Sequence, residues 1–178
     1  MKALRFIFFG ILSVIGLFLF VALLVKKDYN VSREIVINKP KQVVFDYIKQ
    51  LRNQATYSPW ARLDPNMKTT YTGTDATVGF KYTWDGNDAV GQGEQTITNI
   101  SEGNEVDFGL HFVKPFDGLA SAKMKTTAVS ETQTKVTWSL ASSMQYPANI
   151  MLLVVDMNKV IGEDYQKGLV NLKVELDK

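Results

Sequence analysis

The sequence predicts an α+β domain, in which consecutive antiparallel strands pack against a long C-terminal helix, with one membrane-spanning helix in front of the domain. Three observations lead to this prediction. Residues 6–25 carry no charge, residues 67–144 repeatedly alternate apolar and polar side chains, and apolar residues recur every three or four positions from residue 148 onward. Alternation is typical of strands, and a period of three to four residues is typical of a helix. Strands grouped together with a helix on one face are typical of the α+β class.

Composition excludes several classes of function. The chain has 178 residues, with 20 Lys and Arg, 18 Asp and Glu, one His and no Cys. Lys2 and Arg5 are the only charged residues before Lys26, so the rest of the chain balances 18 basic against 18 acidic residues. A neutral domain lacks the cationic surface that nucleic acids require. The absence of Cys excludes disulfides, thiolate metal sites and a cysteine nucleophile.

The first element is the uncharged run at residues 6–25, FIFFGILSVIGLFLFVALLV, which Lys26 and Lys27 end abruptly. As a helix it would be about 30 Å long, which matches the hydrocarbon core of a bilayer. A cleavable signal peptide has a shorter apolar region, of about 7–15 residues, and small residues at its cleavage site. Here a Leu-Leu-Val run takes that place. We therefore predict an uncleaved single-pass anchor in residues 1–27 and a domain in residues 28–178. Basic residues flank both ends of the run, so either orientation in the membrane is compatible with the sequence.

Turn-forming residues divide the rest of the chain into elements. A strand is predicted at 31–37, and after Pro40 a helix at 41–51, followed by a Pro-bounded loop. Further strands are predicted at 67–72, 78–84, 89–101, 105–113, 119–130 and 134–144. The turn signals Asp85-Gly86-Asn87 and Glu102-Gly103-Asn104 separate neighbouring strands. From residue 148 to the end, the helical period predicts one helix of about 30 residues and about 45 Å.

Counting in steps of two along the strands puts aromatic side chains on one face of the sheet. An amphipathic helix opposite a strongly curved sheet leaves a space that such rings could line. We expect this space to be a ligand-binding cavity. The residues expected to line it are Tyr57, Trp60, Phe80, Tyr82, Trp84, Phe108, Phe112, Trp138 and Met144. The alternative is a filled core, because protein interiors pack densely and aromatic stripes usually serve packing.

Four segments, in this order, resemble a known family: VSREIVINKPKQVVFDYI, YSPWARLDP, VGFKYTWDGNDAVGQGEQTI and IGEDYQKGLVNLKVEL. From Tyr29 to Lys178 the chain resembles the SRPBCC superfamily, which has the START-like, helix-grip fold and includes polyketide cyclase/dehydrase-like proteins. The resemblance implies a seven-stranded antiparallel sheet that grips the C-terminal helix, with a cavity between them. It also implies small hydrophobic ligands, such as lipids, sterols or polyketides. None of the four segments is a catalytic signature.

Few residues suggest catalytic or metal chemistry. His111 is the only histidine, and its position in the strand alternation places it on the solvated face. Gly91-Gln92-Gly93 predicts a bulge or sharp bend in the strand, and Glu94, which follows it, is the one candidate polar group of the cavity. A buried carboxyl there would have a raised pKa and could transfer a proton, whereas the alternative is a salt bridge at the sheet edge. No metal or cofactor is expected, since the acidic turn after Trp84 lacks the further ligand of a calcium loop.

The leading functional hypothesis is a membrane-anchored binding module that holds a small hydrophobic ligand between the sheet and the C-terminal helix. One alternative is an enzyme of the cyclase/dehydrase type, with Glu94 or a tyrosine such as Tyr82 as the proton donor. A second alternative is a membrane-tethered protein-interaction domain, which would have a filled interior and an exposed apolar patch.

Overall fold

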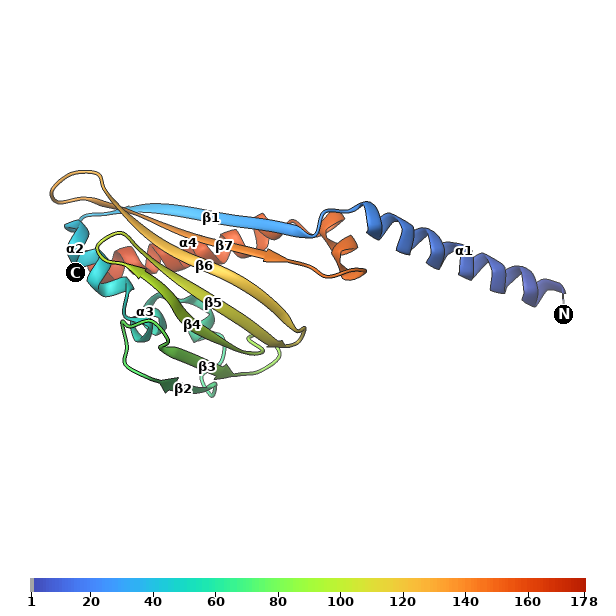
Figure 1. The fold of residues 1–178 in the computed structure, drawn as a ribbon, viewed down its shortest axis with the longest axis horizontal. Coiled ribbons are helices and arrows are strands. Elements are labelled where there is room, and N and C mark those ends of the chain that lie inside the picture. Colours follow the sequence, from blue (N-terminus) through green and yellow to red (C-terminus); the bar gives the residue numbers. More distant parts are fainter. Residues whose placement is uncertain (1) are drawn as a thin grey trace.

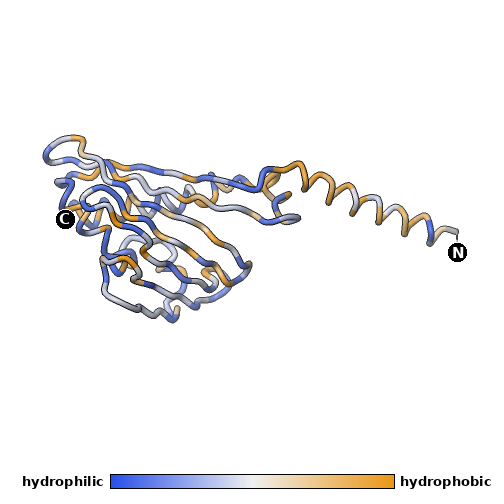
Figure 2. The backbone as a smooth tube through the Cα atoms, viewed as in Figure 1, coloured by the Kyte–Doolittle hydropathy of each residue, from blue (hydrophilic) through white to orange (hydrophobic). Residues whose placement is uncertain are grey.

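The computed structural model describes residues 2–178 (Figure 1). Helix α1 (Lys2–Leu24) projects from one end of the sheet-and-helix domain and roughly continues its long axis. Figure 2 shows that α1 is apolar along most of its length, whereas apolar and polar residues alternate along the strands. The apolar run predicted to span a membrane is therefore helical, and it extends away from the domain except at its C-terminal end, where Ala22 is buried.

The seven strands form one antiparallel sheet in the order β1-β7-β6-β5-β4-β3-β2. The strands are β1 (Asp28–Ile37), β2 (Lys68–Thr72), β3 (Lys81–Asp85), β4 (Gln92–Ser101), β5 (Glu105–Lys114), β6 (Gly118–Ala128) and β7 (Thr134–Ser143). The predicted fold class is confirmed, and most strand ends lie within a few residues of their predicted positions. Val78 is an exception, since it was predicted to begin a strand but precedes β3 and is 62% exposed.

The helical segments other than α1 pack on the sheet or connect to it. They are α2 (Lys41–Ile48), η1 (Leu51–Asn53), α3 (Gln54–Tyr57), η2 (Pro59–Arg62), η3 (Ala148–Leu153) and α4 (Met157–Leu176), where η marks a 3-10 helix. The prediction of one continuous C-terminal helix from residue 148 was wrong. A 3-10 helix comes first, and the 20-residue α4 begins only after Asp156. The Asp156 carboxylate accepts a hydrogen bond from the Lys159 backbone N–H, which caps the start of α4 and separates the two helices.

The core lies where α2 and α4 meet one face of the sheet. Alternate residues are buried from Ala120 to Thr126 on β6 and from Thr134 to Leu140 on β7, as the alternation predicted, whereas on β5 only Val106 and Phe108 are buried. Val44 and Phe45 of α2 and Leu169 and Leu172 of α4 join this buried cluster. The other face of the sheet carries ion pairs, such as Lys123 with Glu105 at 3.0 Å.

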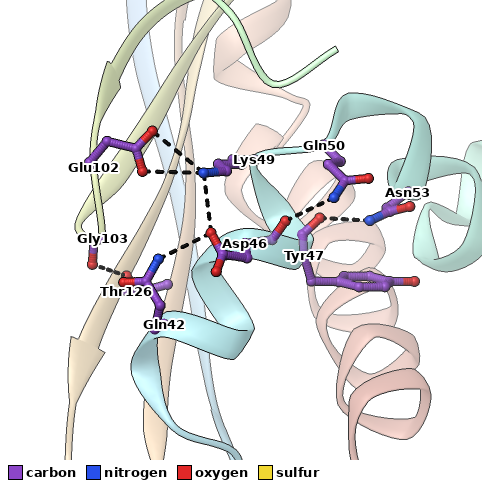
Figure 3. A network of polar contacts seen from close by, with 9 residues as sticks. All are labelled: Gln42, Asp46, Tyr47, Lys49, Gln50, Asn53, Glu102, Gly103 and Thr126. Carbon is purple, nitrogen blue, oxygen red and sulfur yellow. Dashed lines mark hydrogen bonds and ion pairs between the residues drawn. The ribbon is translucent and has the colours of Figure 1, made fainter.

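A polar network holds α2 against the turn between β4 and β5 (Figure 3). The Lys49 ammonium lies 3.1 Å from the Asp46 carboxylate and 3.3 Å from that of Glu102. Hydrogen bonds from Gln42 and then from Lys49 lower the pKa of Asp46. Because exposed ion pairs contribute less than about 1 kcal/mol, this network orients α2 more than it stabilises the fold.

Candidate ligand-binding cavity

A cavity of about 290 Å³ lies between the sheet, α4 and the segment that contains η1, α3 and η2. This volume is at the lower end of the range for small-molecule sites, roughly 300–1,000 Å³. Strands β2 to β7 all contribute to the lining, and the first half of α4 contributes Ile161 and Tyr165. The exposed lining residues Ala55 and Ala89 mark where the cavity meets the surface, at α3 and at the β3–β4 loop.

One part of the wall is an inner cluster of three rings, Trp60, Trp138 and Tyr165. Trp138 and Tyr165 stack with centroids 4.3 Å apart, and Trp60 lies edge-on to both, at 6.3 and 5.9 Å. Gly168 makes this arrangement possible, since a Cβ at that position would lie 2.7 Å from Cζ3 of Trp138. Three separate elements, η2, β7 and α4, thus supply one aromatic surface.

The other part of the wall is an edge row of four rings along the last strands of the sheet: Tyr71, Tyr82, Trp84 and Phe112. Neighbouring centroids are 5.2, 5.7 and 6.1 Å apart in that order. A bulge between Gln92 and Gly93 shifts the register of β4 against β5. Gly93 also leaves room for Trp84, because a Cβ on Gly93 would lie 2.5 Å from Cζ2 of that ring.

Two buried polar residues, Gln95 and Ser58, interrupt the apolar lining. Gln95 pairs with Tyr82 and with Leu110, which also line the cavity, so its side chain lies on the inner face of β4. Within residues 2–178 the Gln95 amide makes no hydrogen bond to another side chain or to the backbone. A glutamine amide can both donate to and accept from a ligand, and in Gln95 no hydrogen bond to the described residues has to be broken first.

The ionisable groups of the lining are three tyrosines, and none is a base at neutral pH. Burial, and to a smaller extent the neighbouring Tyr71, raises the pKa of Tyr82 to about 12. Burial also raises the pKa of Tyr71 and of Tyr165. These phenols therefore stay protonated and can donate hydrogen bonds to a ligand.

The structure brings five of the nine expected residues into the cavity lining: Trp60, Tyr82, Trp84, Phe112 and Trp138. Tyr57, Phe80 and Phe108 belong to the solid core instead, each 3% exposed or less. Met144 follows the end of β7, on the side of the domain from which α1 leaves, and its backbone N–H donates to the Lys27 carbonyl at 2.9 Å.

Glu94 does not line the cavity. Its carboxylate lies 2.9 Å from the Lys81 ammonium on the outer face of the sheet. Successive residues of a strand point to opposite faces, and since Gln95 points inward, Glu94 points outward. His111 also lies on the outer face, with Nε2 3.1 Å from the Asp117 carboxylate. Among residues 2–178 no cluster of His, Asp and Glu is arranged to hold a metal ion.

Several residues of the cavity lining were not predicted from the sequence. Gln95 and Tyr165 were detectable, because Gln95 shares the strand face of the aromatic residues and Tyr165 lies on the apolar stripe of the last helix. Leu51 and Met67 were predicted as the last residue of a helix and the first residue of a strand, but Leu51 lies in η1 and Met67 precedes β2, so the predicted periods did not place their side chains in the cavity.

Comparison with solved structures supports the same architecture. The Zhui aromatase/cyclase from Streptomyces sp. R1128 is similar with a TM-score of 0.60 and 11% identity, covering 84% of this chain and 94% of that one. Major latex-like protein 151 from Panax ginseng has a TM-score of 0.59 and 12% identity, and the match covers 84% of this chain and 98% of that one. The Mll3558 protein from Rhizobium loti has a TM-score of 0.61 and 16% identity, and the match covers 84% of this chain and 97% of that one. At these identities the likeness shows the fold alone.

A search of curated proteins gives no match. The family model described as "Polyketide cyclase / dehydrase and lipid transport" matches residues 29–177, which is nearly all of the chain after α1. The seven-stranded sheet, the C-terminal helix and the cavity between them agree with the helix-grip fold expected of the SRPBCC superfamily. The chain therefore belongs to the polyketide cyclase / dehydrase and lipid transport family.

Proposed function

We propose that this chain is a membrane-anchored binding protein that holds a small hydrophobic ligand in the cavity between the sheet and α4. The observation that carries the proposal is the lining itself, in which two aromatic surfaces flank Gln95, whose amide is not hydrogen-bonded to the described residues. Removing apolar ligand surface from water contributes roughly 25 cal/mol per Å². Gln95 would then select the orientation of a ligand that has one polar end.

The family resemblance supports this class of ligand, since the matched family is described by lipid transport as well as by cyclase and dehydrase activity. An enzymatic role has less support. The lining contains no carboxylate, imidazole or amine, and a phenol with a pKa of about 12 is a poor general acid at neutral pH. A binding role requires none of these groups.

The anchor, residues 1–27, and the domain, residues 28–178, are two parts of the same proposal. The span Arg5–Leu24 is long and apolar enough to cross a bilayer, and little of it is buried against the domain. A signal sequence passes the same test, but the end of α1 supports retention. The Asn149 side chain, which is fully buried, donates hydrogen bonds to the Ala22 and Val25 carbonyls. Cleavage after Val25 would disrupt this contact.

Ligand binding is tested with residues 28–178 after circular dichroism has shown that they are folded. Native mass spectrometry after exposure to a lipid extract should show a retained small molecule, and a fluorescent fatty acid should bind and be displaced. Gln95→Leu should weaken the binding of the fatty acid by about tenfold, which corresponds to one lost hydrogen bond of about 1.4 kcal/mol. Gln166→Leu on α4, half-buried but outside the cavity lining, is the matched control and should bind as the unchanged protein does. No retained mass together with no fatty-acid binding would reject the binding role.

Anchoring is tested with the full chain. The intact mass of the protein in the membrane fraction should include residues 1–25, and alkaline carbonate should not extract it. A mature protein that lacks these residues would show that the segment is a signal peptide.

A further inference from the structure

The η3 segment, Tyr146–Val155, has the composition of a membrane-contacting element although it lies within the domain sequence, between β7 and α4. It reads YPANIMLLVV and contains no charged residue. Met151, Leu153 and Val154 are 48%, 62% and 79% exposed. The domain leaves about half or more of each of these side chains uncovered, so in water this apolar surface would lack the stabilisation that burial gives.

The η3 segment is also fixed to the end of α1. The Asn149 Nδ2 lies 2.7 Å from the Ala22 carbonyl oxygen and 2.9 Å from that of Val25. Carbonyls in the last turn of a helix have no partner within the helix, so Asn149 takes the place of the missing backbone donors. The Tyr146 hydroxyl lies 3.5 Å from the Leu19 carbonyl one turn earlier.

These contacts determine the depth of the η3 segment if α1 spans a bilayer. The last turn of α1 would then lie at the boundary between hydrocarbon and headgroups, and η3, which is beside it, would lie at the same level. Figure 1 shows this short helix at the end of the domain from which α1 emerges. A tyrosine is favoured at this level, and exposed Lys26 and Lys27 suit the headgroup region.

The groove between the two elements has an apolar part and a charged part. Val21 and Leu24 of α1 and Leu152 and Val155 from the η3 side line the apolar part, whereas Asp28 and Asp156 belong to the lining at the start of β1 and of α4. In a bilayer the apolar part would contact acyl chains, and the charged part would lie toward the headgroups. The apolar surface of α1 thus continues into the exposed side chains of the η3 segment.

We propose that the η3 segment is a second membrane contact, inserted at the interface of the leaflet in which α1 ends. This inference rests on the proposed anchoring by α1. The domain would then be held at two points, and the ends of β1 and β7 at Asp28 and Ser143 would face the lipid surface. The occupant of the exposed apolar surface is therefore lipid, and not a second copy or another protein.

The chain has no cysteine, so single cysteines can be introduced into the full protein and labelled with an environment-sensitive fluorophore. The test variants are Leu153→Cys and Val154→Cys. Val174→Cys, at a 60% exposed position near the other end of α4, is the matched control. Leu12→Cys, in the middle of α1, reports on the anchor. The labelled proteins are reconstituted in vesicles of phosphatidylcholine and phosphatidylglycerol that contain a phosphatidylcholine spin-labelled either near the headgroup or deep in the acyl chain.

We expect the probes at residues 153 and 154 to be quenched more strongly by the shallow spin label than by the deep one. The probe at residue 12 should be quenched mainly by the deep spin label, and the probe at residue 174 should be quenched by neither. Quenching at residue 12 without quenching at 153 and 154 would overturn this inference and leave the anchor intact. No lipid quenching at residue 12 would reject the anchor, and the inference with it. Probes at 153 and 154 that are shielded from water but not quenched by lipid would also overturn the inference, in favour of a protein partner.

Discussion

Trp138 of β7 stacks on Tyr165 of α4, with ring centroids 4.3 Å apart and ring planes inclined by 19°. This pair joins the last strand to the last helix and also lines the cavity. The stack depends on a close approach of the helix, because Gly168 on the next turn of α4 leaves no space for a side chain. Packing of the fold and shape of the cavity therefore depend on the same contact.

Gly168→Ala should destabilise the domain by about 1–2 kcal/mol. The added methyl group would meet Trp138, and overpacking typically costs about 1–3 kcal/mol, whereas the gain in helix propensity offsets at most about 1 kcal/mol. Urea denaturation of residues 28–178, followed by tryptophan fluorescence, measures the change. Gly118→Ala is the control, because a Cβ there would meet nothing within 4 Å. Equal stability of Gly168→Ala and the unchanged protein would contradict the packing argument.

The sequence predicted the strands and the inner face of the sheet well, because alternation of side chains is a local property. It predicted neither the break before α4 nor which aromatic residues line the cavity. The apolar period runs through Val154 and Val155 without interruption, and only the Asp156 cap shows that a new helix begins. Phe108 and Phe112 share one face of β5, yet the first is core and the second is cavity wall. Their difference depends on what the helices cover, which no strand pattern contains.

Ala122→Leu should abolish most binding of a fluorescent fatty acid and leave the fold intact. Ala122 is buried on β6 and lines the cavity, so a larger side chain would occupy space that the ligand needs. We expect a loss of affinity of tenfold or more, that is about 1.4 kcal/mol, with little loss of stability because the new atoms fill a cavity. Ala128→Leu, at an exposed position on the same strand, is the control for the general effect of the substitution. Unchanged affinity in Ala122→Leu would show that the ligand binds elsewhere.

The Tyr82 phenol should lose its proton at a pH about two units higher in the folded protein than in the unfolded chain. Burial raises its pKa to about 12, whereas an unfolded tyrosine has a pKa of about 10. Between these values the unfolded state has lost the proton and the folded state has kept it, so the contribution of Tyr82 to stability falls as the pH rises from about 10 to about 12. The difference in tyrosinate absorbance between the unchanged protein and Tyr82→Phe isolates this group. In urea, the titration midpoint obtained from the same absorbance difference should lie near pH 10. A midpoint near pH 10 in the folded protein as well would show that the Tyr82 ring is not desolvated.

Asn149→Leu should detach α1 from the domain without unfolding the sheet. Leucine has a similar size but cannot donate to the Ala22 and Val25 carbonyls, which would be left without this partner. Leaving buried polar groups unpaired costs about 1–3 kcal/mol, so local opening of the link after α1 should rise by about tenfold. Lys26 and Lys27 lie in that link, and the Lys27 carbonyl is held by the Met144 backbone N–H. Trypsin cleavage at these lysines, in the full chain in nanodiscs, therefore measures the opening.

Asn30→Leu is the control, since Asn30 is exposed on β1 and its side chain makes no hydrogen bond to the described residues. Cleavage of Asn149→Leu at the rate of the unchanged protein would show that Asn149 does not hold the two parts together.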